Sequence, residues 1–301
     1  MGWEGEKGWP MKILGISASY RKWGNTDILV WHALKGARCE GSEIRFLRLT
    51  DLEIRQCTGC FACMLKSVDC VQDDHFPALL SAMRWADGVI LGSPVYLLCS
   101  AGSIQTMIPR FFRMGYTEEF KDKPGLALVA AGGPGWDTFA VPQVSLFFRF
   151  LGMPVLDHVV GHGQGPGEVF YDEKACIRAV EGGAGLARGE TEFRGDPGTC
   201  PACHFDLVVT RPDGSAYCVL CDLFGQWVEE GGARRFEPVP GESSRMGPGE
   251  MRKHFEESIL TSAERFRSRR QDIRERLKRF QVEIAAHPVQ KGRGHRKADE
   301  R

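Results

Sequence analysis

The sequence lacks the long apolar run that a membrane-spanning helix needs. No stretch approaches the roughly 20 apolar residues that cross a bilayer, and Met1 to Glu6 contain no apolar run typical of a signal peptide. A net charge is also absent, because 39 Lys and Arg balance 39 Asp and Glu. Bulk charge therefore indicates no polyanionic partner, and we expect a cytoplasmic protein that does not bind membranes.

A disulfide framework is absent as well. The eleven cysteines divide into two groups of four and three isolated residues, and this odd count favours metal ligands in a reducing compartment. Of the isolated residues, Cys39 and Cys176 are predicted to fill the core, and a packing role is favoured for Cys99.

The first cysteine group lies within one short loop with the spacing C-x2-C-x2-C-x6-C. Its members are Cys57, Cys60, Cys63 and Cys70. A single zinc ion is usually held by two separated pairs of cysteines, whereas three thiolates this close suit a larger object with several corners, such as a [4Fe–4S] cluster. The spacing favours the cluster, and a zinc site or redox-active cysteines are the alternatives.

Short apolar runs alternate with helical patterns over most of the first 186 residues. Strands are expected at 11–16, 43–49, 87–92, 125–131 and 155–160, and helices at 27–35, 76–85, 101–112, 139–151 and 172–186. Continuous apolar strands separated by helices are typical of a parallel sheet that is covered on both faces. The sequence therefore predicts an α/β fold with a doubly wound, five-stranded parallel sheet.

Small and polar residues follow the first, third and fourth strands, at 17–26, 93–96 and 131–137. Ligands of such sheets bind outside the carboxyl ends of the strands. The first of these loops runs directly into a helix, whose free N–H groups attract anions. It contains no G-x-G-x-x-G, so it is no dinucleotide fingerprint, and an ordinary loop with an Asn/Thr cap is the alternative.

Three motifs together resemble one family. Residues 17–26 (SASYRKWGNT) are similar to an FMN-phosphate loop, 93–96 (SPVY) to a loop along the flavin, and the compact cysteine loop 57–70 to a cluster motif. In this order they resemble the iron–sulfur flavoprotein branch of the NADPH-dependent FMN reductase family, over about residues 11–188. Ser19 departs from the pattern, because proline is commoner at that position.

The resemblance implies a flavodoxin-like fold, bound FMN, a [4Fe–4S] cluster, and a homodimer or homotetramer in which cluster and flavin meet across a subunit interface. It also implies that phosphate and ring contacts come from the matching loops. The candidate FMN-binding residues are Ser17, Ser19, Arg21, Asn25, Thr26, Ser93, Pro94, Val95, Tyr96, Gly132, Gly133 and Trp136.

The second cysteine group has the spacing C-x2-C-x14-C-x2-C. Its members are Cys200, Cys203, Cys218 and Cys221. Two such pairs joined by a hairpin form a four-thiolate site for zinc, or for iron as in rubredoxin. We therefore predict a zinc-ribbon-like module at 196–230, and we expect His204 not to bind the metal because four thiolates complete a tetrahedron.

The remaining segments are assigned by composition and periodicity. Residues 1–10 are expected to be a lead-in, 231–249 a linker, 250–287 a long amphipathic helix and 288–301 a basic tail. From residue 251 onward, fifteen Lys and Arg face eight Asp and Glu. This excess favours a solvated helix that packs on protein over a nucleic-acid-binding surface.

These observations predict an oxidoreductase that passes electrons between a one-electron carrier and a two-electron partner, because FMN takes two electrons and a cluster moves one. The expected electron partners are a ferredoxin-like carrier or NAD(P)H, and no acid–base residue is assigned. One alternative is an NAD(P)H-dependent FMN or quinone reductase with structural metal sites. Another is a redox-responsive regulator that binds nucleic acid.

Overall fold

The structure is a computed structural model that describes residues 10–196, 198–247 and 249–285. The chain divides into two units at Lys253. Nearly all of the lead-in predicted at 1–10, and the whole basic tail predicted at 288–301, lie outside the described residues.

Five parallel strands form the central sheet, as the sequence predicts. Their order is β2-β1-β3-β5-β6, and the short strand β4 (Cys99–Ser100) pairs antiparallel with the end of β3. The parallel strands are β1 (Lys12–Ser17), β2 (Glu43–Arg48), β3 (Gly88–Tyr96), β5 (Gly125–Ala131) and β6 (Val155–His162). This is the flavodoxin-like strand order, whose switch point lies between β1 and β3.

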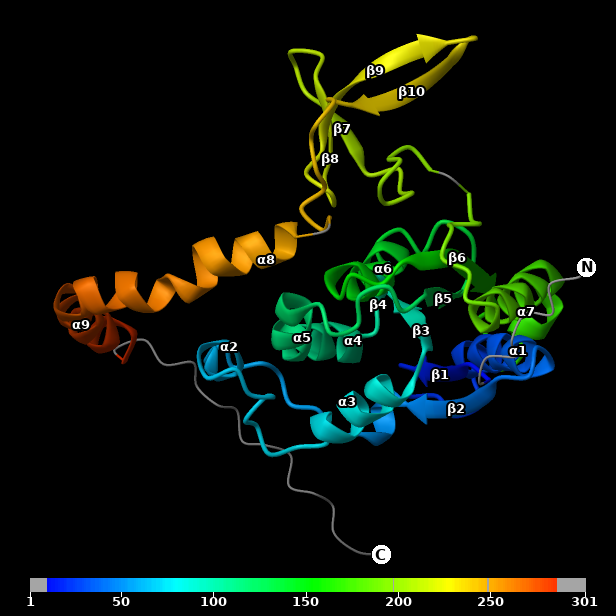
Figure 1. Ribbon diagram of the computed structural model, residues 1–301, viewed down its shortest axis with the longest axis horizontal. Coiled ribbons are helices and arrows are strands. Elements are labelled where there is room, and N and C mark those ends of the chain that lie inside the picture. Colours follow the sequence, from blue (N-terminus) through cyan, green and yellow to red (C-terminus); the bar gives the residue numbers. More distant parts are fainter. Residues whose placement is uncertain (1–9, 197, 248, 286–301) are drawn as a thin grey trace, which may run out of the picture. The chain divides into compact units, whose positions relative to one another are not determined.

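Helices cover both faces of the sheet (Figure 1). One face carries α1 (Asn25–Cys39) and α7 (Glu173–Ala187). The other carries α3 (Phe76–Trp85), α4 (Gly102–Met107), α5 (Phe112–Thr117) and α6 (Ala140–Phe150). Shorter turns connect these elements: η1 (Leu49–Asp51), α2 (Ala62–Leu65), η2 (Ile108–Phe111) and η3 (Glu168–Tyr171).

The two faces of the sheet are packed differently. Under α1 and α7 the core is aliphatic, with Leu29 and Leu34 fully buried against strand residues such as Ile13. On the other face the core is aromatic. The ring centroid of Phe111 lies 5.0 Å from that of Phe76 and 5.3 Å from that of Phe147, both edge to face, an arrangement that stabilises aromatic clusters.

The segment that holds the second cysteine group, 198–238, is called the cysteine-rich module. It forms a second sheet of four antiparallel strands in the order β10-β9-β8-β7. Its strands are β7 (Val208–Thr210), β8 (Ala216–Cys218), β9 (Phe224–Glu230) and β10 (Ala233–Pro238). The linker prediction for 231–249 is therefore wrong in its first part. Gly231 and Gly232 both have positive φ, 60° and 80°, and form a two-residue hairpin turn of the kind that favours glycine.

The sequence predicts one long helix at 250–287. In the structure this helical segment is interrupted. It consists of α8 (Glu250–His254), a π-helical turn (Phe255–Leu260) and α9 (Ser262–Ala285). Several large apolar residues of α9 face solvent within its own unit, because Phe266, Leu277, Phe280 and Ile284 are all exposed. None of the described helices combines the length and the apolar character required to cross a membrane.

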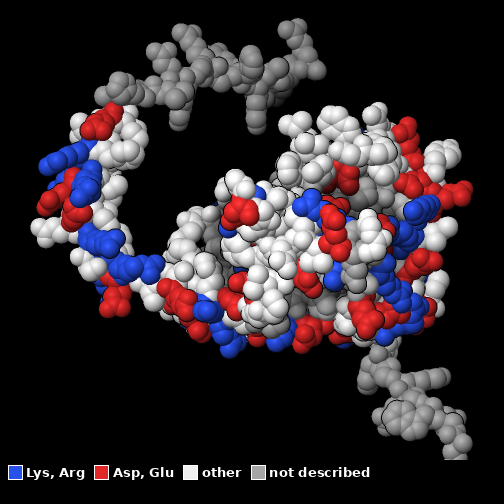
Figure 2. Space-filling model, turned by 90° about the horizontal axis from the view of Figure 1, so that it is seen from above, with Lys and Arg blue, Asp and Glu red and all other residues white. Residues whose placement is uncertain are grey.

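Charged residues are distributed without a large patch of one sign on the face that Figure 2 presents, where acidic and basic side chains alternate over the main unit. In α9, eight Lys and Arg are interspersed with four Asp and Glu.

Two glycines let α1 and α7 cross closely, which holds α1 and the loop before it in place. A Cβ at Gly183 would collide with the carbonyl of Ala33, and one at Gly36 with the carbonyl of Val180.

We expect Gly183→Ala to lower the free energy of unfolding, measured in urea titrations, by about 1–3 kcal/mol, the usual cost of overpacking. Gly102→Ala is the matched control, because a Cβ there meets nothing within 4 Å. An unchanged stability of Gly183→Ala would show that the helices separate without cost.

Candidate functional site

The loop between β1 and α1 leads into a helix start that has no side-chain cap. The hydroxyl of Ser19 accepts a hydrogen bond from the backbone N–H of Arg21 (3.1 Å) and donates to its carbonyl (3.2 Å), which curls the loop. Helix α1 then begins without a side-chain cap, so the N–H groups of its first turn are available to a ligand.

A buried carboxylate fixes this loop from below. Asp27 accepts hydrogen bonds from the hydroxyl of Ser17 (2.5 Å) and the backbone N–H of Trp23 (2.8 Å). It also forms an ion pair of 2.6 Å with Arg48, and both side chains are almost fully buried. Ser17 thus supports the loop through Asp27, and it is absent from the lining of the cavity above it.

A cavity of about 230 Å³ lies at the switch point between β1 and β3. Eight of the twelve predicted FMN-binding residues line it: Ser19, Arg21, Asn25, Thr26, Pro94, Val95, Tyr96 and Gly132. The three loops that the sequence analysis singled out therefore converge on one site. Their arrangement fits a phosphate-bearing ligand, because the helix N-terminus and the Arg21 guanidinium meet at the same cavity.

The other predicted residues have different places. The hydroxyl of Ser93 accepts a hydrogen bond from the backbone N–H of Ala101 (2.9 Å) and donates to the carbonyl of Pro94 (2.8 Å), so it stabilises the loop from inside. Gly133 and Trp136 are absent from the cavity lining. Trp136 is 58% exposed.

The loop after β6 also contributes to the cavity, although no motif in the sequence indicates it. Gly163 and Gln164 line the cavity, and Asn25 holds this loop with both ends of its amide. Its Nδ2 donates to the carbonyls of Gly163 (2.7 Å) and Gly165 (3.0 Å), and its Oδ1 accepts from the N–H of Gly167 (2.9 Å). The amide of Asn25 therefore positions a wall of the cavity rather than serving as a free donor.

The first cysteine group lies on the loop between η1 and α3. Cys60 is exposed, and Cys57, Cys63 and Cys70 are half-buried. Gly59 has a φ of 66°, which favours glycine, and its N–H donates to the sulfur of Cys57 (3.4 Å). The backbone thus curls around the thiols, and this donor set fits an iron–sulfur cluster.

The other three cysteines of this loop influence the thiol of Cys63. Burial raises the pKa of the Cys63 thiol, and the negative charges of the other three cysteines raise it further. The backbone N–H of Ala62 lowers the pKa of the more exposed Cys60. Negative charge at Cys63 is therefore unfavourable unless a cation or cluster offsets it.

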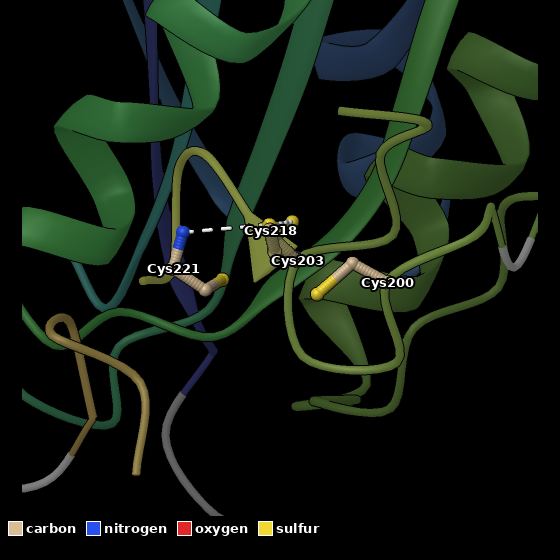
Figure 3. A group of neighbouring side chains, drawn as sticks. All are labelled: Cys200, Cys203, Cys218 and Cys221. Carbon is tan, nitrogen blue, oxygen red and sulfur yellow. Dashed lines mark hydrogen bonds between the residues drawn. The ribbon is translucent and has the colours of Figure 1, made fainter. Parts of the chain in front are cut away.

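The second cysteine group forms a closed four-sulfur site (Figure 3). All four residues, Cys200, Cys203, Cys218 and Cys221, are buried, and their sulfurs lie within 4.8 Å of one another. The sulfurs of Cys203 and Cys218 are 3.6 Å apart, and the N–H of Cys221 donates to Cys218 (3.4 Å). Four thiols at this spacing suit a tetrahedral zinc or iron ion.

The cysteine-rich module is docked on the main sheet and its helices. Arg149 of α6 donates to the carbonyls of Ala202 (2.7 Å) and Cys203 (3.0 Å). The ring of His158 stacks on that of Phe205, with centroids 4.6 Å apart. His204 stacks on Phe193 at 3.9 Å, consistent with its predicted non-ligating role.

A flavodoxin-like sheet with a cavity at its switch point is one of the frames in which proteins bind FMN. The chain belongs to the NADPH-dependent FMN reductase family, whose sequence profile matches residues 11–166, and it is therefore a flavin-dependent oxidoreductase.

Among its relatives is an iron–sulfur flavoprotein of Archaeoglobus fulgidus, which is 31% identical over 188 residues, covering 62% of this chain and 84% of the relative. An iron–sulfur flavoprotein of Methanocaldococcus jannaschii is 34% identical over 174 residues, covering 54% and 89%. These matches confirm the resemblance seen in the motifs.

A solved structure of a flavone reductase is similar over a greater length. It has a TM-score of 0.73 and 25% sequence identity, and the match covers 94% of this chain and 100% of that one. The similarity therefore extends well beyond residue 166, where the match of the family profile ends.

The docking of the cysteine-rich module should depend on pH through His158. Burial, together with the positive charge of Arg149, lowers the pKa of His158 from 6.5 to about 3. The unfolded chain takes up this proton near pH 6.5, so the stabilisation is complete above that pH and is lost as the pH falls toward 3. Between pH 7 and 5 we expect a loss of at most about 2 kcal/mol from this group.

His158→Phe tests this dependence, because it removes the titration and keeps an aromatic ring against Phe205. The free energy of unfolding of the metal-loaded proteins is measured in urea at pH 7 and pH 5. We expect the variant to lose less stability than the native protein over this interval. Equal losses would mean that His158 is solvated in the folded state.

Proposed function

We propose that the protein is an FMN- and [4Fe–4S]-containing oxidoreductase that passes electrons between a one-electron carrier and a two-electron partner. The observation that carries the proposal is that one compact unit holds both a phosphate-type cavity and a compact four-cysteine loop. A bound flavin exchanges two electrons, and a cluster exchanges one at a time.

The size of the cavity suggests which residues bind the phosphate of FMN and which bind its ring. Its volume of about 230 Å³ is below the ~300–1,000 Å³ of pockets that enclose a drug-sized ligand. We therefore assign Arg21, Ser19, Thr26 and the N-terminus of α1 to the phosphate. We assign residues 93–96 and 132–136 to the flavin ring.

The position of the cysteine loop favours an oligomer. Of the described residues that line the cavity, none comes from the segment 57–70, and this loop instead packs on α5, where the rings of Phe61 and Phe112 stack at 6.3 Å. Tyr96, Leu97 and Trp136 are all more than half exposed, as apolar residues at an interface often are. We infer a homodimer or homotetramer in which the cluster of one subunit approaches the flavin of another.

The two proposed cofactors suggest the electron partners. A ferredoxin-like carrier suits the cluster, and NAD(P)H suits the flavin. We propose a cytoplasmic location, because exposed and half-buried thiols of this kind persist in a reducing compartment. The second cysteine site is assigned a structural zinc or iron ion.

Cofactor counting on the anaerobically purified protein tests the proposal. We expect about four iron, four sulfide and one FMN per chain, and one further metal ion in the cysteine-rich module. Cys60→Ser should lose most of the iron and sulfide and keep its FMN, because the cavity and the cysteine loop are built from different segments. Cys39→Ser, which changes an exposed cysteine of α1, is the control. Two zinc ions per chain without sulfide would contradict the proposed cluster. A flavin reductase with structural metal sites would then be the better description.

The match to the flavone reductase favours a second, more specific candidate. Because it covers 94% of this chain, whereas the Archaeoglobus fulgidus flavoprotein match covers 62%, we propose that the two-electron acceptor is a flavone-like aromatic compound with a conjugated C=C bond. Two electrons and two protons convert that bond to a single bond.

Anaerobic stopped-flow absorption spectroscopy tests this candidate. The protein is reduced, and flavone is then added. We expect the absorbance of oxidised flavin to return, while flavanone, which lacks the double bond, leaves the flavin reduced. A flavin that stays reduced with both compounds would contradict the candidate without touching the cofactor assignment.

A further inference from the structure

Arg110 is a fully buried cation that contacts a cysteine of the first group. Its side chain and that of Asp74 are both fully buried and form a two-pronged ion pair, with Nη1 to Oδ2 at 2.6 Å and Nη2 to Oδ1 at 3.0 Å. The Nε–H of Arg110 points elsewhere and donates to the sulfur of Cys70 at 3.2 Å.

The same pair ties both ends of the cysteine loop together. Arg110 also donates to the carbonyl of Arg55 (2.6 Å), and Asp74 accepts from the backbone N–H groups of Arg55 (2.8 Å) and Phe76 (3.0 Å). Residue 55 precedes the first cysteine, and residue 74 follows the last one. Arg110 therefore holds the entry and the exit of the loop at a fixed separation.

We propose that Arg110 is a positioning residue that fixes Cys70 as the fourth cluster ligand and raises the reduction potential of the cluster. This inference rests on the proposed [4Fe–4S] site. A donor to a ligand sulfur stabilises the added negative charge of the reduced form, and such hydrogen bonds are among the factors that set the potential.

The surroundings make this effect large. The guanidinium carbon lies 4.7 Å from the ring centroid of Phe76, and the group is shielded from water, so its field at the sulfur is weakly screened. Asp74 neutralises the charge, but it binds the far side of the guanidinium. The donor nearest to Cys70 is the Nε–H of Arg110.

Arg110→Lys tests the proposal, because it keeps the charge and cannot hold Asp74 and Cys70 together. An anaerobic redox titration followed by electron paramagnetic resonance measures the midpoint. At the native midpoint we expect the ratio of reduced to oxidised cluster to fall about tenfold, a shift of ~59 mV for one electron. Arg113→Lys is the matched control: Arg113 is one turn away and pairs with Asp69 (3.0 Å) and Glu119 (3.7 Å). Its midpoint should stay unchanged.

Asp74→Asn gives a second test with the opposite sign. It removes the counter-charge and leaves Arg110 beside Cys70, so the midpoint should rise. This variant decides the matter if Arg110→Lys fails to fold, which circular dichroism and FMN content reveal. A midpoint that stays unchanged or falls in Asp74→Asn would then overturn the proposal.

The remaining outcomes are distinct. If Arg110→Lys keeps its fold and FMN but loses iron, the positioning role of Arg110 is supported. A full cluster with an unchanged midpoint in Arg110→Lys would overturn the inference and leave the proposed function standing. A native protein without sulfide would overturn both, and the cofactor count on that protein shows this before any variant is made.

Discussion

Ion pairs and hydrogen bonds from shielded arginines hold the loops on which this protein depends. Arg48 pairs with Asp27 beneath the loop between β1 and α1, Arg110 pairs with Asp74 where the ends of the cysteine loop meet, and Arg149 donates to the carbonyls of the cysteine-rich module. These segments have little regular structure of their own, so their backbone groups need partners from elsewhere in the fold. A guanidinium meets this need because it donates several hydrogen bonds in a fixed plane.

The architecture separates the tasks of the protein along the chain. The sheet and its helices supply a rigid frame, and the crossing of α1 and α7 places the start of α1 at the switch point. The cysteine loop is inserted after β2 and packs on α5, away from the cavity lining. The cysteine-rich module follows the last helix of the frame and rests on α6 and β6 through Arg149 and His158. Each centre can therefore be altered without rebuilding the others, which is why single-residue variants distinguish among them.

A single copy of the chain leaves large apolar side chains exposed beside the cavity. Tyr96, Leu97 and Trp136 expose large apolar areas near the proposed flavin ring. An open ring site of this kind suits a partner subunit, a planar aromatic acceptor, or both in turn. The proposed interface and the proposed substrate class therefore draw on the same property of the site.

Local pattern in the sequence determined most of the frame and the two cysteine groups. Helix 76–85 and strand 125–131 were predicted with the bounds that the structure has, because strong apolar runs and helical spacing are local signals. The tertiary structure decided what depends on distant partners. Asn25 bonds a loop almost 140 residues away, Ser17 donates a hydrogen bond to Asp27, and Arg110 reaches Cys70 across 40 positions. Such contacts leave no periodic trace in the sequence, because they follow from which loops the folded sheet brings together.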